Sequence, residues 1–273
     1  MREYAGSSFK TYENVLEIDH SNVLLRINLS SFRHNSEREG SSDILDNAKR
    51  WLLNAHDANV APIHDFDQVQ GKLIPIIRSR MSISTCLRTF VDESHLRPLS
   101  RMLPNGGDAV VMLSIDLGPT VMQVNGEMLR KWSKTFDECM PIAIGNLEKI
   151  SPRRFVRVMP GVYAGSWGDG LEPSRILLPN LVRKMENFSN SVIMIPAENE
   201  MLIARANDER GLLNMLGAAK NMMSGACRPV SSKMYRYLNG IATEFVPVYC
   251  SVAKASASLE RTWERQTYSS SSM

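Results

Sequence analysis

Five side chains that could bind a metal ion lie close together in the first quarter of the chain. They are His56, Asp57, His64, Asp65 and Asp67. Imidazole nitrogens and carboxylate oxygens together suit divalent cations. However, the two histidines are spaced neither as H-x-x-x-H nor as H-x-H, and Pro62 lies between them. We therefore predict a polar loop without a metal, and keep His56, His64, Asp65 and Asp67 as the only candidate ligands.

The glycine-rich segment AGSWGDGLEPS, residues 164–174, is the best loop for a site. Its glycines would let the backbone approach a ligand closely. Ser166 lacks the G-x-S-x-G frame of a nucleophile elbow, and the segment lacks the G-x-x-x-x-G-K of a phosphate loop. A tight connection capped by Asp169 or Ser174 is the simpler interpretation. Ser166 and Asp169 remain the candidates for catalysis in this loop.

Two further acids, Glu198 and Glu200, stand in the segment PAENE. Two carboxylates one residue apart on an extended chain share a face and could act as an acid–base pair. Exposed acids of a turn explain them more simply. We keep Glu198 as the third candidate for catalysis.

Short strands and helices must position these residues. Residues 22–30 and 72–78 are typical of strands, and Pro75 should confine the second to a sheet edge. Two β-rich arms flank Asp116–Pro119, which favours a hairpin. Thr135 and Glu138 have the spacing of a capping box, although Pro141 should kink the helix or delay its start.

The second half of the chain repeats this alternation. A hairpin is predicted over 153–167 with its turn at Pro160-Gly161, followed by a helix over 173–188. Strands at 192–195 and 201–204 should pair across PAENE. Asn207 should cap the next helix. That helix has an apolar stripe of Leu212, Leu213, Leu216, Ala219 and Met223. The segment FVPVYCSVA should form one last strand.

Hairpins interleaved with helices predict an α+β fold with a mixed, mostly antiparallel sheet. The loop near Asn105 is the only candidate boundary. We expect an N-terminal α+β region over 1–105, a C-terminal α+β region over 106–250, and a mostly disordered tail over 251–273. One continuous domain is the alternative.

Composition excludes several classes of protein. The 273 residues carry a net charge of +3, and the basic residues are spread out, so nucleic acid is not expected as a partner. No apolar run approaches the roughly 18 residues of a membrane span, and no signal peptide is evident. The cysteines, Cys86, Cys139, Cys227 and Cys250, lack C-x-x-C spacing, which is typical of reduced thiols in the cytoplasm.

The order of the segments resembles one known family. DILDNAKRWLL, LIPIIR, VVMLSIDLG, AIGNLEKI, GVYAGSWGDGLEPSRILLP and VIMIPAENEMLIA follow one another as in the YtpQ-like family of uncharacterised bacterial proteins, a domain of unknown function. The resemblance covers roughly residues 44–237. Relatives tend to carry Arg-Asp where this chain has Glu198-Asn199, so a shared site there would be altered. The resemblance implies no activity.

The missing catalytic triad, metal motif and nucleotide loop favour a non-catalytic, cytoplasmic binding or interaction protein without a cofactor. Its partner is unknown, and another protein is one possibility. The alternative is a hydrolase-like enzyme of unfamiliar type, with a site joining the Gly165–Gly170 loop to the Pro196–Glu200 turn. A cleft that joins this loop to this turn would favour the enzyme, and a flat apolar patch would favour the binding protein.

Overall fold

The computed structural model describes residues 8–12, 15–20, 23–28, 65–81, 83, 99–103, 107–116, 121–183, 190–226 and 228–270, with only the backbone for 8–28 and 266–270. The chain divides into two compact units, residues 1–65 with 116–122, and residues 66–115 with 123–273. This division differs from the boundary expected near residue 105. Among the described residues, no helix is both long enough and apolar enough for a bilayer span.

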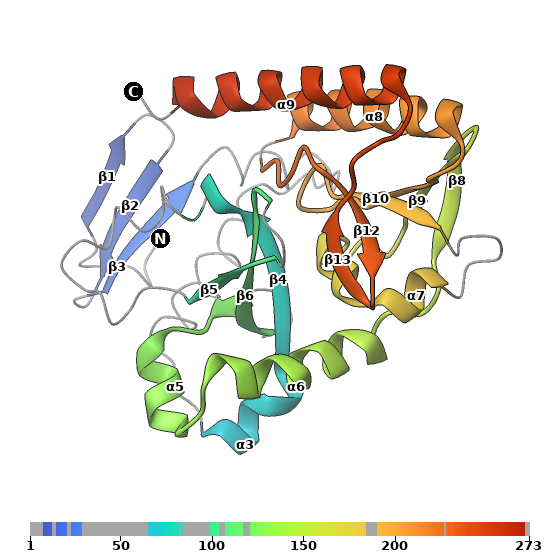
Figure 1. The fold of residues 1–273 in the computed structure, drawn as a ribbon. Coiled ribbons are helices and arrows are strands. Elements are labelled where there is room, and N and C mark those ends of the chain that lie inside the picture. Colours follow the sequence, from blue (N-terminus) through green and yellow to red (C-terminus); the bar gives the residue numbers. More distant parts are fainter. Residues whose placement is uncertain are drawn as a thin grey trace. The chain divides into compact units, whose positions relative to one another are not determined.

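The first unit contains an antiparallel sheet of three consecutive strands, in the order β1-β2-β3 (Figure 1). The strands are β1 (Ser8–Tyr12), β2 (Val15–His20) and β3 (Val23–Asn28). Their register pairs Phe9 with Ile18 and Ile18 with Leu25. The strand expected over 22–30 is therefore confirmed. Residues 44–55, whose apolar residues stand at helical spacing and favour a helix, lie outside the described residues.

The second unit has two sheets, and the smaller one has the order β4-β6-β5. Its strands are β4 (Leu73–Ser79), β5 (Ser100–Met102) and β6 (Ala109–Asp116). Pro75 does lie in an edge strand, because only β6 pairs with β4 among the described strands. A further strand, β7 (Val121–Gln123), follows β6 in the chain, and residues 117–120 between them lie outside the description.

Short helices accompany this sheet. They are α3 (Phe66–Val69), η2 (Gln70–Lys72), α5 (Gly126–Trp132) and α6 (Phe136–Lys149). The capping box is confirmed, since Thr135 Oγ1 accepts from the Glu138 amide and Glu138 Oε2 accepts from the Thr135 amide. Pro141 lies inside α6 and does not delay its start, because the helix begins at Phe136. Leu147 of α6 packs against Ile74 and Ile76 of β4.

The larger sheet has six antiparallel strands in the order β13-β12-β10-β11-β9-β8. They are β8 (Phe155–Met159), β9 (Val162–Gly165), β10 (Ser191–Met194), β11 (Leu202–Arg205), β12 (Met234–Leu238) and β13 (Ile241–Glu244). The hairpin with its turn at Pro160-Gly161 and the strand pair across PAENE are both confirmed. Together with the helices, the antiparallel sheets confirm the α+β class.

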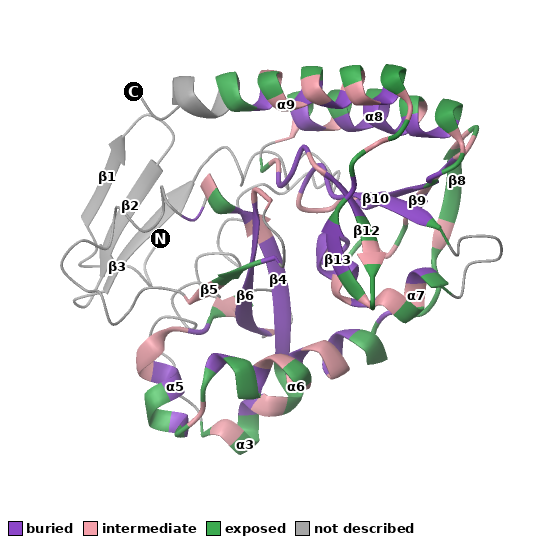
Figure 2. Ribbon diagram, viewed as in Figure 1, coloured by how far each residue is buried: buried purple, intermediate pink, exposed green. Residues whose placement is uncertain are grey.

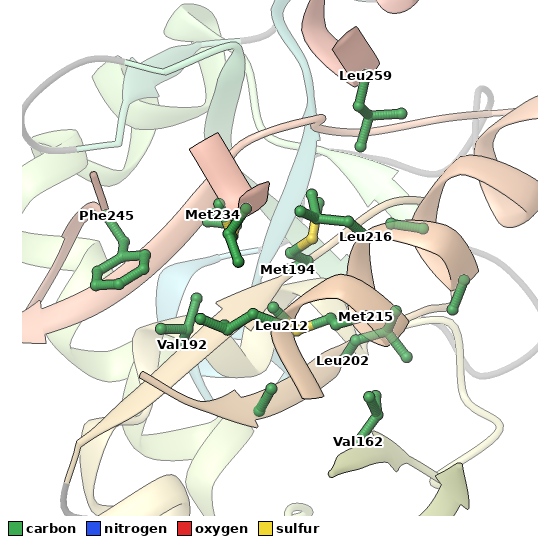
Figure 3. Close-up of a cluster of buried hydrophobic side chains, with 14 of the residues drawn as sticks. Val162, Val192, Met194, Leu202, Leu212, Met215, Leu216, Met234, Phe245 and Leu259 are labelled. Atoms are coloured by element: carbon green, nitrogen blue, oxygen red, sulfur yellow. The ribbon is translucent and has the colours of Figure 1, made fainter. Parts of the chain in front are cut away.

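Two long helices lie side by side over one face of the six-stranded sheet (Figure 1). They are α8 (Glu209–Gly225) and α9 (Cys250–Ser270). Figure 3 shows the apolar core beneath them, where Leu212, Met215 and Leu216 meet Val192, Met194 and Leu202 of the sheet. Alternate residues of β9, β10 and β11 face this core, and the residues between them, such as Ile193 and Ile203, are buried on the other face of the sheet.

The structure corrects five sequence expectations. Leu213 is 37% exposed and lies outside the apolar stripe of α8, and the cap of this helix is Asp208 instead of Asn207. In the described part of the helix expected over 173–188, the chain forms two separate helices, η4 (Pro173–Leu177) and α7 (Pro179–Arg183). Residues 245–253 form no strand.

The tail is not mostly disordered, because α9 reaches Ser270 and buries Leu259 and Trp263 against the core.

Candidate functional site

An open hollow of about 440 Å³ lies at the β8 end of the six-stranded sheet. Its described lining consists of Arg157, Gly161, Tyr163, Arg205, Asn207 and Asp208. Volumes of roughly 300–1,000 Å³ are usual for ligand pockets, although most such pockets are more apolar than this one. The lining holds two guanidinium groups against one carboxylate, which favours an anionic ligand.

Strand register explains why the side chains of this hollow meet. Arg157 is paired with Tyr163, and Tyr163 is paired with Ile203 on the next strand. Arg205 stands two positions beyond Ile203, so it shares that face of the sheet. The alternate residues Val162, Ala164, Leu202 and Ala204 point to the opposite face, where they pack beneath α8. The hollow therefore lies on the face of the sheet away from α8.

The wall of the hollow joins the β8–β9 turn to the start of α8. Asp208 Oδ1 accepts the Gly211 amide at 2.8 Å and so caps the helix. Asn214 Nδ2 donates to the Pro160 carbonyl at 2.9 Å. Gly161 has φ +77°, and a Cβ there would lie 2.4 Å from Asp208 Oδ2 and 2.7 Å from Gly211 Cα. Glycine is required because the turn and the helix approach each other so closely.

A second group of polar side chains is buried where β6 begins. The Asp108 carboxylate accepts hydrogen bonds from the Ser231 hydroxyl, from the Ser232 amide at 3.1 Å and from the Tyr235 hydroxyl at 3.4 Å. Burial raises the pKa of Asp108 although the bonds from Ser231 and Ser232 lower it, and burial also raises the pKa of Tyr235. Since Ser231 and Tyr235 are themselves buried, this cluster joins the two sheets of the unit.

Glu198 lies between two arginines. Its Oε2 is 3.3 Å from Arg228 Nη1 and 3.8 Å from Arg78 Nη2. Burial lowers the pKa of Arg78, and the negative charge of Glu198 opposes that effect. The PAENE turn is also held through the backbone, because the Glu198 amide donates to the Arg228 carbonyl. Glu198, a candidate for catalysis from the sequence, is thus engaged in ion pairs.

The other candidates for catalysis lie in the loop 165–170. Ser166 is exposed, and its amide donates to the Arg154 carbonyl. Asp169 forms an ion pair of 2.6 Å with the fully buried Arg175. Ser166 and Asp169 thus contact other residues than Glu198 does. The contacts described above do not bring the three candidates together in one site.

The candidate metal ligands are only partly described. His56 and His64 lie outside the described residues, Asp65 is exposed, and Asp67 accepts from Gln70 Nε2 at 3.2 Å. Among the residues that the structure describes, no group of three histidine, cysteine, aspartate or glutamate side chains could hold a metal ion.

The sequence interpretation missed the residues that line the hollow. It noted only that the basic residues are spread out along the chain, and it gave Arg157, Tyr163 and Arg205 no role. The alternation of the strands does place Arg157 and Tyr163 on one face, but only if the β8–β9 register is known. Comparison of the chain with protein-family models, curated proteins and solved structures gives no match. The resemblance to the YtpQ-like family therefore stays a prediction.

Proposed function

We propose that this chain is a non-catalytic binding protein that holds an anionic group in the hollow between Arg157 and Arg205. One observation carries the proposal, namely that two arginines and a tyrosine from three adjacent strands converge on an open hollow of about 440 Å³. Guanidinium groups present several donors in a fixed plane that matches carboxylate and phosphate. A phenol and the Asn207 amide add neutral hydrogen-bonding groups.

The pairing of the candidate acids supports binding over catalysis. A general base must be able to reach a proton of the substrate. Asp169 is committed to Arg175, and Glu198 to Arg78 and Arg228. We also place the protein in the cytoplasm. Cys139 and Cys250, both free thiols, fit a reducing compartment.

Isothermal titration calorimetry with inorganic phosphate and with malonate tests the proposal. Both anions should bind, and Arg157→Gln or Arg205→Gln should each weaken binding about tenfold, since a charge-assisted pair contributes roughly 1.5–3 kcal/mol. The matched control is the double variant Arg153→Gln, Arg154→Gln, which removes two exposed charges just before β8. It should change affinity by less than about twofold, as expected of exposed charges that do not line the hollow.

Two outcomes would overturn the proposal. One is that neither anion binds the wild-type chain. The other is that the control variant loses as much affinity as the two lining variants, because the anion would then follow the general positive field instead of this hollow.

A further inference from the structure

Among the described strands, β8 forms one edge of the six-stranded sheet, beside the hollow. It ends the six-stranded sheet, and among the described strands only β9 pairs with it (Figure 1). The Gly165 amide donates to the Met201 carbonyl next to β11, whereas the Ser166 amide donates to the Arg154 carbonyl. The backbone carbonyl of Arg154 therefore points toward β9. Because hydrogen-bonding direction alternates along an antiparallel strand, Phe155 and Arg157 turn their N–H and C=O groups outwards. Such an edge can accept another strand.

The side chains of β8 indicate the chemistry of that strand. Val156 is 49% exposed and Val158 45% exposed, and most of β8 is open to solvent (Figure 2). Arg157 is exposed as well, and its side chain lines the hollow. Val156 is paired with Ala164, whose side chain lies in the core beneath α8. Val156 and Arg157 therefore point to opposite faces of the sheet.

We infer that β8 binds an extended acidic peptide of a partner protein as an added strand, with one carboxylate of the peptide in the hollow. This inference rests on the proposed function, because it names the bearer of the anionic group. Residues directly opposite each other on paired strands project from the same face, about 5 Å apart. A peptide glutamate opposite Arg157 would thus reach the hollow. Its two neighbours would lie on the other face, beside Val156, and should be apolar.

Charge favours such a peptide over a second copy of this chain. Arg153, Arg154 and Arg157 are all exposed on or beside β8, and no acidic residue occurs from 153 to 159. Two copies of β8 paired edge to edge would bring these like charges together, which is destabilising. The bulge between Arg157 and Met159 also interrupts regular pairing, a usual protection against self-association. An acidic peptide with its glutamate opposite Arg157 can pair regularly with Phe155 and Val156, and only its far end lies beside the bulge.

Fluorescence anisotropy with synthetic peptides tests the inference. The probe is fluorescein-labelled Thr-Val-Glu-Val-Thr with blocked termini. One comparison peptide carries glutamine in place of glutamate, and the other carries an N-methylated glutamate, which keeps the charge but cannot donate to Arg157. Both changes should weaken binding about tenfold, as should Arg157→Gln in the protein. Arg153→Gln serves as the control of equal charge and should change affinity by less than about twofold.

The outcomes of these measurements distinguish the peptide inference from the proposed function. If phosphate and malonate bind the hollow but the N-methylated peptide binds as well as the probe, strand addition is wrong and the anion site stands. If the glutamine peptide binds as well as the probe, the peptide carboxylate is not bound in the hollow, and the inference is wrong even where phosphate and malonate bind. If neither small anions nor the probe bind, both proposals are wrong. A dimer in light scattering that is lost in Val156→Lys would assign the edge to a second copy and overturn the peptide.

Discussion

Arg175 and Asp169 form a two-pronged ion pair, with Nη1 2.8 Å from Oδ1 and Nη2 2.6 Å from Oδ2. The Arg175 side chain is completely buried, and its Nε donates to the Ser151 hydroxyl at 2.9 Å. Its guanidinium carbon also lies 4.2 Å from the centre of the Trp167 ring. The glycine-rich loop is therefore fixed by a buried cation beneath it, which accounts for the acid in this loop without catalysis.

We expect Asp169→Ala to lower the free energy of unfolding by about 3 kcal/mol, because it leaves a buried guanidinium without its counter-charge. Glu148→Ala removes an exposed carboxylate of α6 and should cost less than about 0.5 kcal/mol. Urea denaturation of the two variants measures the difference. Equal effects would mean that water replaces Asp169 at no cost and that the pair does not hold the loop.

Asp108 and Asp169 should respond to pH with opposite signs. Burial raises the pKa of Asp108 above its ordinary 3.8. The folded chain thus holds this proton more tightly than the unfolded chain, and the resulting stability is full below pH 3.8 and lost as the pH rises through the raised pKa. Burial also raises the pKa of Asp169, but hydrogen bonds from Arg175 and Leu171 outweigh it and the net pKa is lowered. Its stabilisation is present above pH 3.8 and lost on acidification.

The unfolding free energies of Asp108→Asn and Asp169→Asn, measured from about pH 3 to about pH 7, check these signs. The wild-type advantage over Asp108→Asn should shrink as the pH rises, whereas the advantage over Asp169→Asn should grow from the acid end. An advantage over Asp108→Asn that grows with pH would show that the ionised carboxylate is the stabilising form.

Leu216→Ala and Leu213→Ala form a matched pair on α8. Leu216 is 4% exposed beneath the helix, so its truncation should cost about 2–5 kcal/mol. Leu213 is 37% exposed, and its truncation should cost less than about 1 kcal/mol. Thermal or urea denaturation distinguishes the two. A large loss at Leu213 would mean that a further part of the protein, or a partner, covers this face of α8.

Gly161→Ala should destabilise the chain more than Gly240→Ala. Both glycines have positive φ, +77° and +81°, so alanine strains the backbone at either position by roughly 1 kcal/mol. Only at Gly161 would the new Cβ meet Asp208 and Gly211, whereas nothing lies within 4 Å at Gly240. The contact should add about 1–3 kcal/mol to the loss of unfolding free energy. Equal losses in urea would mean that the wall of the hollow yields easily.

Much of the local structure follows from the sequence alone, because it depends on neighbouring residues. Thr135 and Glu138 are close enough in the chain to form the capping box wherever the helix lies. Alternating apolar residues determine the strands on either side of PAENE, since one face of each must be buried. The same reasoning failed at Leu213, where helical spacing alone could not define how wide the covered face of α8 is.

Contacts between distant residues decided the rest. The tail past residue 250 is helical because Val252, Leu259 and Trp263 bury apolar surface against the core beneath α8 and α9. These residues stand at helical spacing, a pattern that the sequence interpretation overlooked because the segment is mostly polar. Asp108 meets Ser231 across more than a hundred residues, and Arg157 shares a hollow with Arg205 only through strand register. Chain composition determined which groups were available, but only the packing of the sheets determined which of them came together.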